Sequence, residues 1–282
     1  MRGCLRLSSV TAAAIVAALA GGCSPHVLVA VGTCPDGGMF VTSSGCTRLT
    51  EDLVGWWRLD ESAGSTVARD SARNNDGTLV ALDPTKVWVP GRAGGGLAVE
   101  GNGYVNVMPS PSIDSIDEQV TIAGWGYLEG TIDDFATIAS REEADTLDQH
   151  YHISINSRGE VPTVFIKTDT AGAILVGTTP VTRQTWVHVA GTYDGAVARM
   201  YVDGKEVLNQ KLTGLFAADT TPFILGANGN GVDMGITERF PGKIDEIMLY
   251  RRALSATEIA QLHDGALFLS PLPIVQDAGA RE

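Results

Sequence analysis

The stretch from residue 186 to residue 207 decides the fold, and it opens with Trp186-Val-His-Val-Ala190. Two of the three inner positions are Val and a His stands between them, which is the period-two pattern of a β-strand with one buried face. Further along, Met200-Tyr-Val-Asp-Gly-Lys-Glu-Val207 places two β-branched runs around Asp203-Gly204. An Asp-Gly pair between two such runs favours a type I′ turn, so this part predicts a β-hairpin.

Runs of the same kind recur on both sides of this hairpin. They cover residues 54–59, 103–108, 120–125, 152–156, 163–167, 223–225 and 244–250. Many short strands separated by turns favour an antiparallel sandwich of two sheets. One helix is also predicted, because Ser255-Ala-Thr-Glu258 is a capping box and Gly265 stands where a helix would stop.

Several segments, in this order, resemble the laminin-G-like, concanavalin A-like lectin/glucanase jelly-roll family. They are Trp57-Arg-Leu-Asp-Glu-Ser-Ala-Gly64, residues 91–97, Thr121-Ile-Ala-Gly-Trp125, the hairpin region, and Phe240-Pro-Gly-Lys-Ile-Asp-Glu-Ile-Met-Leu-Tyr250. The resemblance spans residue 53 to about residue 266. It implies an all-β, two-sheet antiparallel jelly roll with one short C-terminal helix.

The N-terminus has the layout of a secretory signal peptide. Arg2 and Arg6 precede a short apolar run, and Leu19-Ala-Gly-Gly-Cys23 follows it. This segment resembles a bacterial lipobox, although Ala20 stands where that pattern prefers Leu. The resemblance implies cleavage before Cys23, lipidation of Cys23 and a lipid anchor in the membrane. The alternative is an ordinary signal peptide, a chance cysteine and a secreted protein.

Two further cysteines, Cys34 and Cys46, follow the predicted cleavage site. In an oxidising compartment two such cysteines predict a disulfide, and too few His or Cys residues surround them for a zinc site. We therefore divide the chain into a signal peptide (1–22), a tether with a disulfide loop (23–50), a jelly-roll domain (51–268) and a flexible tail (269–282).

The chain is acidic, with a formal net charge of −13, and loss of Arg2 and Arg6 makes it more so. An acidic surface disfavours nucleic acid and anionic membrane surfaces as partners. It is compatible with neutral sugars and with cations such as Ca²⁺.

A calcium site is the main candidate for a functional centre. In many jelly-roll relatives the aspartate that matches Asp245 binds a structural Ca²⁺. The resemblance implies partners in the loop Asp70-Ser-Ala-Arg-Asn-Asn-Asp-Gly77, and it assigns Asp70, Asn74, Asn75, Gly77 and Asp245 to the metal. Carboxylates, amides and carbonyls are the oxygens that Ca²⁺ prefers. The alternative is an ordinary Asx-rich turn beside a strand aspartate.

Large aromatics on the predicted strands are expected to pack the core. Trp125, Trp186, Tyr201 and Tyr250 belong to this group. Stacking on a sugar is the alternative role, and it needs exposed rings.

Two polar groups in the sequence are less convincing as sites. His150 and His152 have the spacing of two imidazoles on one strand face, but no third metal ligand is evident, so we interpret them as a polar loop edge that enters a strand. Glu142-Glu143-Ala-Asp145 has the composition of a charged loop.

Catalytic carboxylates are not evident in the sequence. Sandwich glucanases present theirs as Glu-x-Asp-x-x-Glu on one strand, and this triplet does not occur. Asp245 and Glu246 are adjacent, and a regular strand would point them to opposite faces. We therefore expect a non-catalytic module on the cell envelope that binds a carbohydrate or a surface protein. The alternatives are a glycan-active hydrolase or lyase and a structural envelope lipoprotein.

Overall fold

The structure is a computed structural model that describes residues 32–33, 39–40, 49–142, 149–216, 220–229 and 235–265. The chain divides into two compact units, one made of residues 50–263 and one made of residues 1–49 and 264–282. In the second unit, strands β1 (Gly32–Thr33) and β2 (Met39–Phe40) pair antiparallel. The following paragraphs concern residues 50–263.

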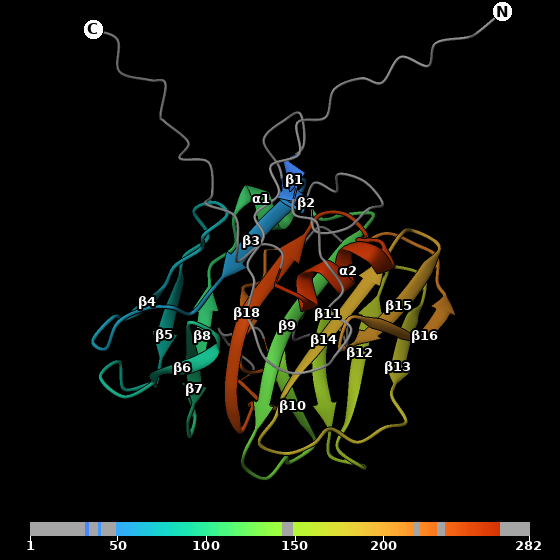
Figure 1. The fold of residues 1–282 in the computed structure, drawn as a ribbon. Coiled ribbons are helices and arrows are strands. Elements are labelled where there is room, and N and C mark those ends of the chain that lie inside the picture. Colours follow the sequence, from blue (N-terminus) through green and yellow to red (C-terminus); the bar gives the residue numbers. More distant parts are fainter. Residues whose placement is uncertain are drawn as a thin grey trace, which may run out of the picture. The chain divides into compact units, whose positions relative to one another are not determined.

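This unit is a sandwich of two eight-stranded antiparallel sheets (Figure 1). The sheet that contains β18, called the β18 sheet, runs β16-β15-β14-β9-β18-β7-β6, and β3 also pairs with β18. Its strands are β3 (Leu53–Trp57), β6 (Trp88–Ala93), β7 (Gly95–Val99), β9 (Val120–Leu128), β14 (Trp186–Tyr193), β15 (Val197–Val202), β16 (Lys205–Lys211) and β18 (Gly242–Tyr250).

The facing sheet, called the β10 sheet, runs β13-β12-β11-β10-β17-β8-β5-β4. Its strands are β4 (Val67–Ala68), β5 (Gly77–Val80), β8 (Tyr104–Val107), β10 (Phe135–Glu142), β11 (Gln149–Asn156), β12 (Val161–Lys167), β13 (Gly172–Val176) and β17 (Phe223–Leu225). The two-sheet antiparallel sandwich expected from the sequence is therefore confirmed. The turn at Asp203-Gly204 also has the predicted geometry, because both residues have positive φ, 48° and 75°.

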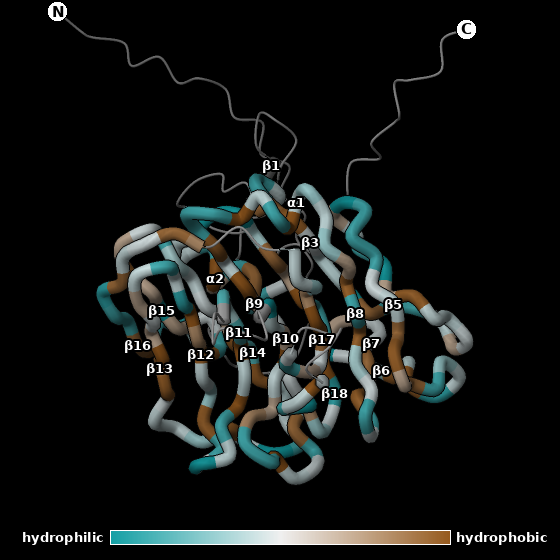
Figure 2. The backbone as a smooth tube through the Cα atoms, turned by 180° about the vertical axis from the view of Figure 1, so that it is seen from behind, coloured by the Kyte–Doolittle hydropathy of each residue, from teal (hydrophilic) through white to brown (hydrophobic). Residues whose placement is uncertain are grey.

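The core lies between the two sheets. Alternate residues of each strand point inward, and the hydrophobic segments in Figure 2 follow the strands while hydrophilic segments gather in loops. Ile122, Val189 and Ile244 of the β18 sheet belong to the same buried cluster as Ile138 and Val164 of the β10 sheet. Burying each such side chain stabilises the fold by roughly 1.5–3 kcal/mol.

A glycine on β9 lets the sheets approach closely. A Cβ added at Gly124 would lie 2.5 Å from Cδ1 of Ile247 and 3.1 Å from Cγ2 of Ile138, which belongs to the facing sheet. Only a residue without a side chain fits this position as the core is packed.

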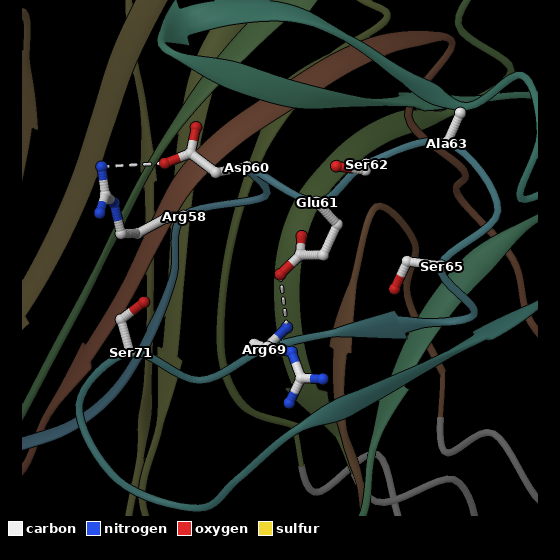
Figure 3. Close-up of a pocket in the computed structure, with 8 residues that line it drawn as sticks. All are labelled: Arg58, Asp60, Glu61, Ser62, Ala63, Ser65, Arg69 and Ser71. Atoms are coloured by element: carbon white, nitrogen blue, oxygen red, sulfur yellow. Dashed lines mark hydrogen bonds and ion pairs between the residues drawn. The ribbon is translucent and has the colours of Figure 1, made fainter.

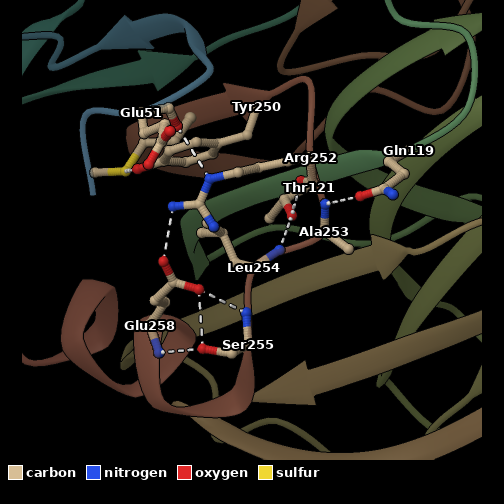
Figure 4. A network of polar contacts seen from close by, with 10 residues as sticks. Glu51, Gln119, Thr121, Tyr250, Arg252, Ala253, Leu254, Ser255 and Glu258 are labelled. Carbon is tan, nitrogen blue, oxygen red and sulfur yellow. Dashed lines mark hydrogen bonds and ion pairs between the residues drawn. The ribbon is translucent and has the colours of Figure 1, made fainter. Parts of the chain in front are cut away.

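Helix α2 (Ala256–His263) covers part of the outer face of the β18 sheet, and the ring of His263 stacks on Trp125 at 5.3 Å. Its predicted capping box is confirmed (Figure 4): Ser255 Oγ accepts from Glu258 N, and Glu258 Oε2 accepts from Ser255 N at 2.8 Å. Arg252 holds the same carboxylate through its other oxygen, at 2.7 Å. The second helix, α1, is short (Pro111–Asp114) and has Ser110 as its N-cap. Within the described ranges, no helix has the length and apolarity needed to cross a bilayer.

Candidate functional site

A polar pocket of about 460 Å³ opens in the segment that connects β3 to β4 and continues past β4 (Figure 3). All of its lining residues lie between positions 58 and 71, and they are Arg58, Asp60, Glu61, Ser62, Ala63, Ser65, Arg69 and Ser71. One continuous segment therefore builds the site. In the sequence, residues 57–64 carry part of the family resemblance, and nothing in their pattern predicts a pocket.

Leu59 explains why this segment exposes its polar residues. It is fully buried in the core cluster and has a φ of 56°, which is uncommon for a residue with a side chain. With Leu59 turned into the core, its neighbours Arg58 and Asp60 are left at the surface, where both line the pocket. Gly64, with a φ of 96°, supplies a second left-handed position before β4.

Arg58 and Asp60 form one wall of the pocket. Arg58 Nη2 lies 2.9 Å from Asp60 Oδ2, and the guanidinium stands over the ring of Trp56, 5.3 Å from its centroid. Asp60 Oδ1 accepts from the backbone N of Gly95 at 2.5 Å. The ion pair is partly exposed and adds little stability, but it fixes one cation and one anion at the pocket.

Glu61 forms a second wall with Arg69. Glu61 Oε1 accepts from the backbone N of Arg69 at 2.9 Å, whereas Oε2 is buried from solvent and has no hydrogen-bond partner in the described part of the chain. Partial burial raises the pKa of the Glu61 carboxyl above its ordinary value. The guanidinium of Arg69 is largely exposed, and its nearest carboxylate is that of Asp76, at 3.9 Å.

The pocket therefore combines two guanidinium groups, two carboxyl groups and hydroxyl groups. The hydroxyls of Ser62 and Ser71 have no partner among the described residues, while Ser65 Oγ donates to the backbone O of Val67 at 2.9 Å. The charges nearly balance, so the site offers many donors and acceptors without a strong net field. Such a lining suits a ligand rich in hydroxyl groups.

Two buried carboxyl groups lie on β18, in the strand that pairs with β3. Asp245 and Glu246 are 0% and 1% exposed. The pairing of β18 with β9 contains a bulge between Asp245 and Met248, and Glu246 has a φ of 51°. Ile244 and Ile247 both belong to the core, so the two acids between them share the outer face. The expectation that they point to opposite faces is wrong, because it assumed a regular strand.

The two acids accept hydrogen bonds from different donors. Asp245 Oδ2 accepts from the backbone N of Arg92 at 2.7 Å and of Ala93 at 3.0 Å, so it holds the last two residues of β6, next to the turn into β7. Glu246 Oε2 accepts from Nε1 of Trp56. Burial raises the pKa of Asp245 to about 7 and that of Glu246 to about 9, and the charge of Asp60 on the pocket wall contributes to both shifts.

Of the predicted calcium ligands, Asp70 organises the loop that follows β4. Its Oδ1 accepts from the backbone N of Trp56 (2.9 Å) and Ala72 (2.8 Å), and its Oδ2 accepts from those of Arg73 (3.2 Å) and Asn75 (3.0 Å). Both oxygens are therefore already used by N–H donors.

The other predicted ligands have equally separate roles. The amide oxygen of Asn75 accepts from Ser110 at 2.6 Å, Asn74 is exposed, and Gly77 begins β5. Among the described residues, no three His, Cys, Asp or Glu side chains are grouped so that they could hold a metal ion. Each of three predicted ligands, Asp70, Asn75 and Asp245, already accepts hydrogen bonds from backbone N–H or side-chain O–H groups. In this arrangement they do not fit the role of ligands to a common calcium ion.

His150 and His152 lie on β11 and are each 4% exposed. The His152 ring stacks on Phe165 at 5.4 Å, and the His150 ring lies 6.2 Å from Phe216. Glu142 ends β10, and Glu143 and Asp145 lie outside the described residues. Cys23, Cys34 and Cys46 also lie outside them, so lipidation and the disulfide stay predictions.

Three of the four aromatics expected in the interior are buried: Trp125 (3%), Tyr201 (2%) and Tyr250 (0%). Trp186 differs, because it is only half-buried and lies outside the core cluster. Its ring lies 5.3 Å from that of Tyr127, which is also half-buried.

The sequence places the chain in a family. Residues 99–260, more than half of the chain, match the family described as the concanavalin A-like lectin/glucanases superfamily. The chain therefore belongs to this superfamily, as the fold indicates. The pocket at residues 58–71 lies outside the matched range. A comparison with curated proteins finds no significant match.

Solved structures share the fold at low sequence identity. Domain 4 of AbnA, an extracellular arabinanase from Geobacillus stearothermophilus, in complex with arabinotriose, is 17% identical, with a TM-score of 0.55 and coverage of 75% of this chain and 98% of that domain. The binding domain of botulinum neurotoxin DC in complex with SialylT is 12% identical (TM-score 0.55; 78% and 52% covered). Trypanosoma rangeli sialidase in complex with sialic acid is 16% identical (TM-score 0.55; 76% and 33% covered). The chain thus spans about half and a third of the last two.

Proposed function

We propose that this protein is a glycan-binding module of the cell envelope, held by a lipid on Cys23, and that it binds without catalysis. The observation that carries the proposal is the pocket at residues 58–71, where carboxyl, guanidinium and hydroxyl groups converge on about 460 Å³. A cavity of this size suits a small ligand of one or a few sugar units.

The ligand class follows from the lining. The hydroxyls of Ser62 and Ser71 can exchange hydrogen bonds with sugar hydroxyls, Arg69 adds exposed donors, and Glu61 lines the pocket beside them. Because Asp60 offsets Arg58, we propose a neutral oligosaccharide as the ligand. Two structures with this fold were solved with arabinotriose and with SialylT, which supports a glycan in general and neither sugar in particular.

The absence of catalysis is part of the proposal. Asp245 and Glu246 are too deeply buried to touch a substrate. In the pocket, Asp60 is engaged by Arg58 and by the N–H of Gly95, and Glu61 has one oxygen on the N–H of Arg69 and the other buried from solvent. A glycosidase needs two carboxyl groups acting together.

Binding of the full-length mature protein to a glycan array tests this function. We expect Glu61→Gln and Arg69→Ala to weaken array binding at least tenfold, while the exposed-site controls Glu118→Gln and Arg158→Ala leave it unchanged. Binding that persists in both pocket variants would overturn the pocket as the site. New reducing ends released from a bound glycan would overturn the non-catalytic part.

A further inference from the structure

Strands β14, β9 and β18 lie side by side in the β18 sheet (Figure 1), and their registers place side chains in rows across its outer face. In one row, His188, Trp125 and Asp245 are neighbours, and they are 2%, 3% and 0% exposed. His263 of α2 stacks on Trp125, and the guanidinium of Arg92 stands 4.5 Å from the Trp125 ring centroid. This row is therefore covered by other parts of the chain.

The next row toward the end of β9 is different. Trp186, Tyr127 and Lys243 are neighbours across the same three strands, and all three are only half-buried. We call these three residues the aromatic platform. Neither aromatic residue belongs to the core cluster or packs against it, so core packing does not explain why two large rings stand here. Aromatic rings left partly exposed in this way are typical of binding surfaces.

Polar groups are fixed around the platform. Lys243 Nζ stands 4.7 Å from the centroid of the Tyr127 ring and 3.2 Å from Glu129 Oε1. Arg183 donates to the backbone O of Glu129 (3.2 Å) and of Gly130 (2.8 Å), and it pairs with Glu160 at 2.5 Å. An aromatic surface bordered by paired charges offers an apolar contact together with hydrogen-bonding groups.

We infer that the aromatic platform is a second glycan-contacting surface, separate from the pocket, and that it takes a neutral sugar ring of a polysaccharide. The rings would pack on the C–H face of the sugar, and Lys243 and Glu129 would bond its hydroxyls. The balanced charges favour a neutral ligand over an anionic one. This inference rests on the proposed function, and it adds a surface contact to the pocket at residues 58–71.

The platform is tested by affinity electrophoresis. The full-length mature protein is run through native gels that contain arabinan, xylan or mixed-linkage β-glucan. We expect at least one polysaccharide to retard the protein, Trp186→Ala and Tyr127→Ala to weaken that binding roughly tenfold, and Trp186→Phe to restore much of it. The control is Phe165→Ala, which removes another half-buried aromatic from the facing sheet. Circular dichroism and melting curves establish that each variant is folded.

The outcomes separate the platform from the pocket. Retardation that Trp186→Ala leaves unchanged, or that Phe165→Ala weakens equally, would overturn the platform. Array binding by the wild type without retardation in any of the three gels would also overturn it, and the pocket would still stand. If a polysaccharide gel still retards Glu61→Gln while this variant no longer binds the array, the result would support two separate surfaces.

Discussion

Trp56 on β3 and Glu246 on β18 are joined by a hydrogen bond from the indole Nε1 to the carboxyl Oε2, and both side chains are 1% exposed. Arg58 stands over the same indole ring and lines the pocket, so Trp56 connects the buried acid to the pocket wall. The pocket wall therefore rests on a carboxyl group whose pKa is about 9.

Glu246 predicts a pH dependence of stability. Its pKa is 4.5 for an ordinary Glu and about 9 in the fold, so between these values the native state keeps a proton that the unfolded chain loses. The stabilising contribution is complete below about pH 4.5 and is lost as pH rises toward 9. Gln does not titrate and keeps an acceptor for Trp56. We expect the melting temperature of Glu246→Gln to rise relative to wild type between pH 5 and about pH 8.5. Parallel curves for the two proteins would contradict this.

The predicted calcium site is tested by melting curves with calcium and with a chelator. Because both oxygens of Asp70 and one of Asp245 accept backbone N–H groups, we expect melting curves in calcium and in EDTA to coincide. A calcium-dependent rise that disappears in Asp245→Ala would instead restore the site expected from the family resemblance. Magnesium serves as the control for a general effect of ionic strength.

The capping box of α2 gives a simple stability test. Ser255→Ala removes the hydroxyl that accepts from Glu258 N, and a lost N-cap costs about 1 kcal/mol. We expect a lower urea midpoint with an unchanged slope, measured by tryptophan fluorescence. Thr182→Ala, at an exposed position, is the matched loss of a hydroxyl and should leave the midpoint unchanged.

The close packing at Gly124 predicts that even one methyl group is harmful. The Cβ of Gly124→Ala would meet Ile247 at 2.5 Å, and overpacking of this kind costs roughly 1–3 kcal/mol. Gly172→Ala on the edge strand β13 is the control, because its Cβ would find only ordinary contacts from 3.8 Å. Equal urea midpoints for the two variants would mean that the sheets adjust at no cost.

Metabolic labelling with an alkyne fatty acid tests the anchor. We expect a bacterial host to label the wild type and to retain it in the membrane fraction, and Cys23→Ser to abolish both. An unlabelled wild type in the soluble fraction would support the alternative of an ordinary signal peptide.

The sequence predicted the fold better than it predicted the site. Alternating runs and the Asp203-Gly204 turn identified the sandwich because period-two patterns directly report a sheet with one buried face. Among the strands that the sequence did not predict are β10 and β13, although Ala136 and Ile138 on β10 and Ala173 and Leu175 on β13 alternate toward the core. Small residues such as alanine are weak signals of a strand.

The sequence also did not predict that the side chains of Asp245 and Glu246 share one face of the sheet, and the reason is different. This arrangement depends on a bulge that adds a residue with positive φ at Glu246, which a pattern of residue types does not reveal. The pocket could not be predicted, because the residue types in a polar loop do not show which side chains face the same space. In the fold, burial of Leu59 sets that arrangement.

A pocket whose lining comes from one continuous segment can vary through that segment. Residues 58–71 carry every lining group, and they lie outside the range that matches the family. Specificity in such a protein can change by exchange of a single loop, without repacking either sheet. The scaffold must still supply what holds the segment, because Asp60 accepts from the N–H of Gly95 and Arg58 stands over the ring of Trp56.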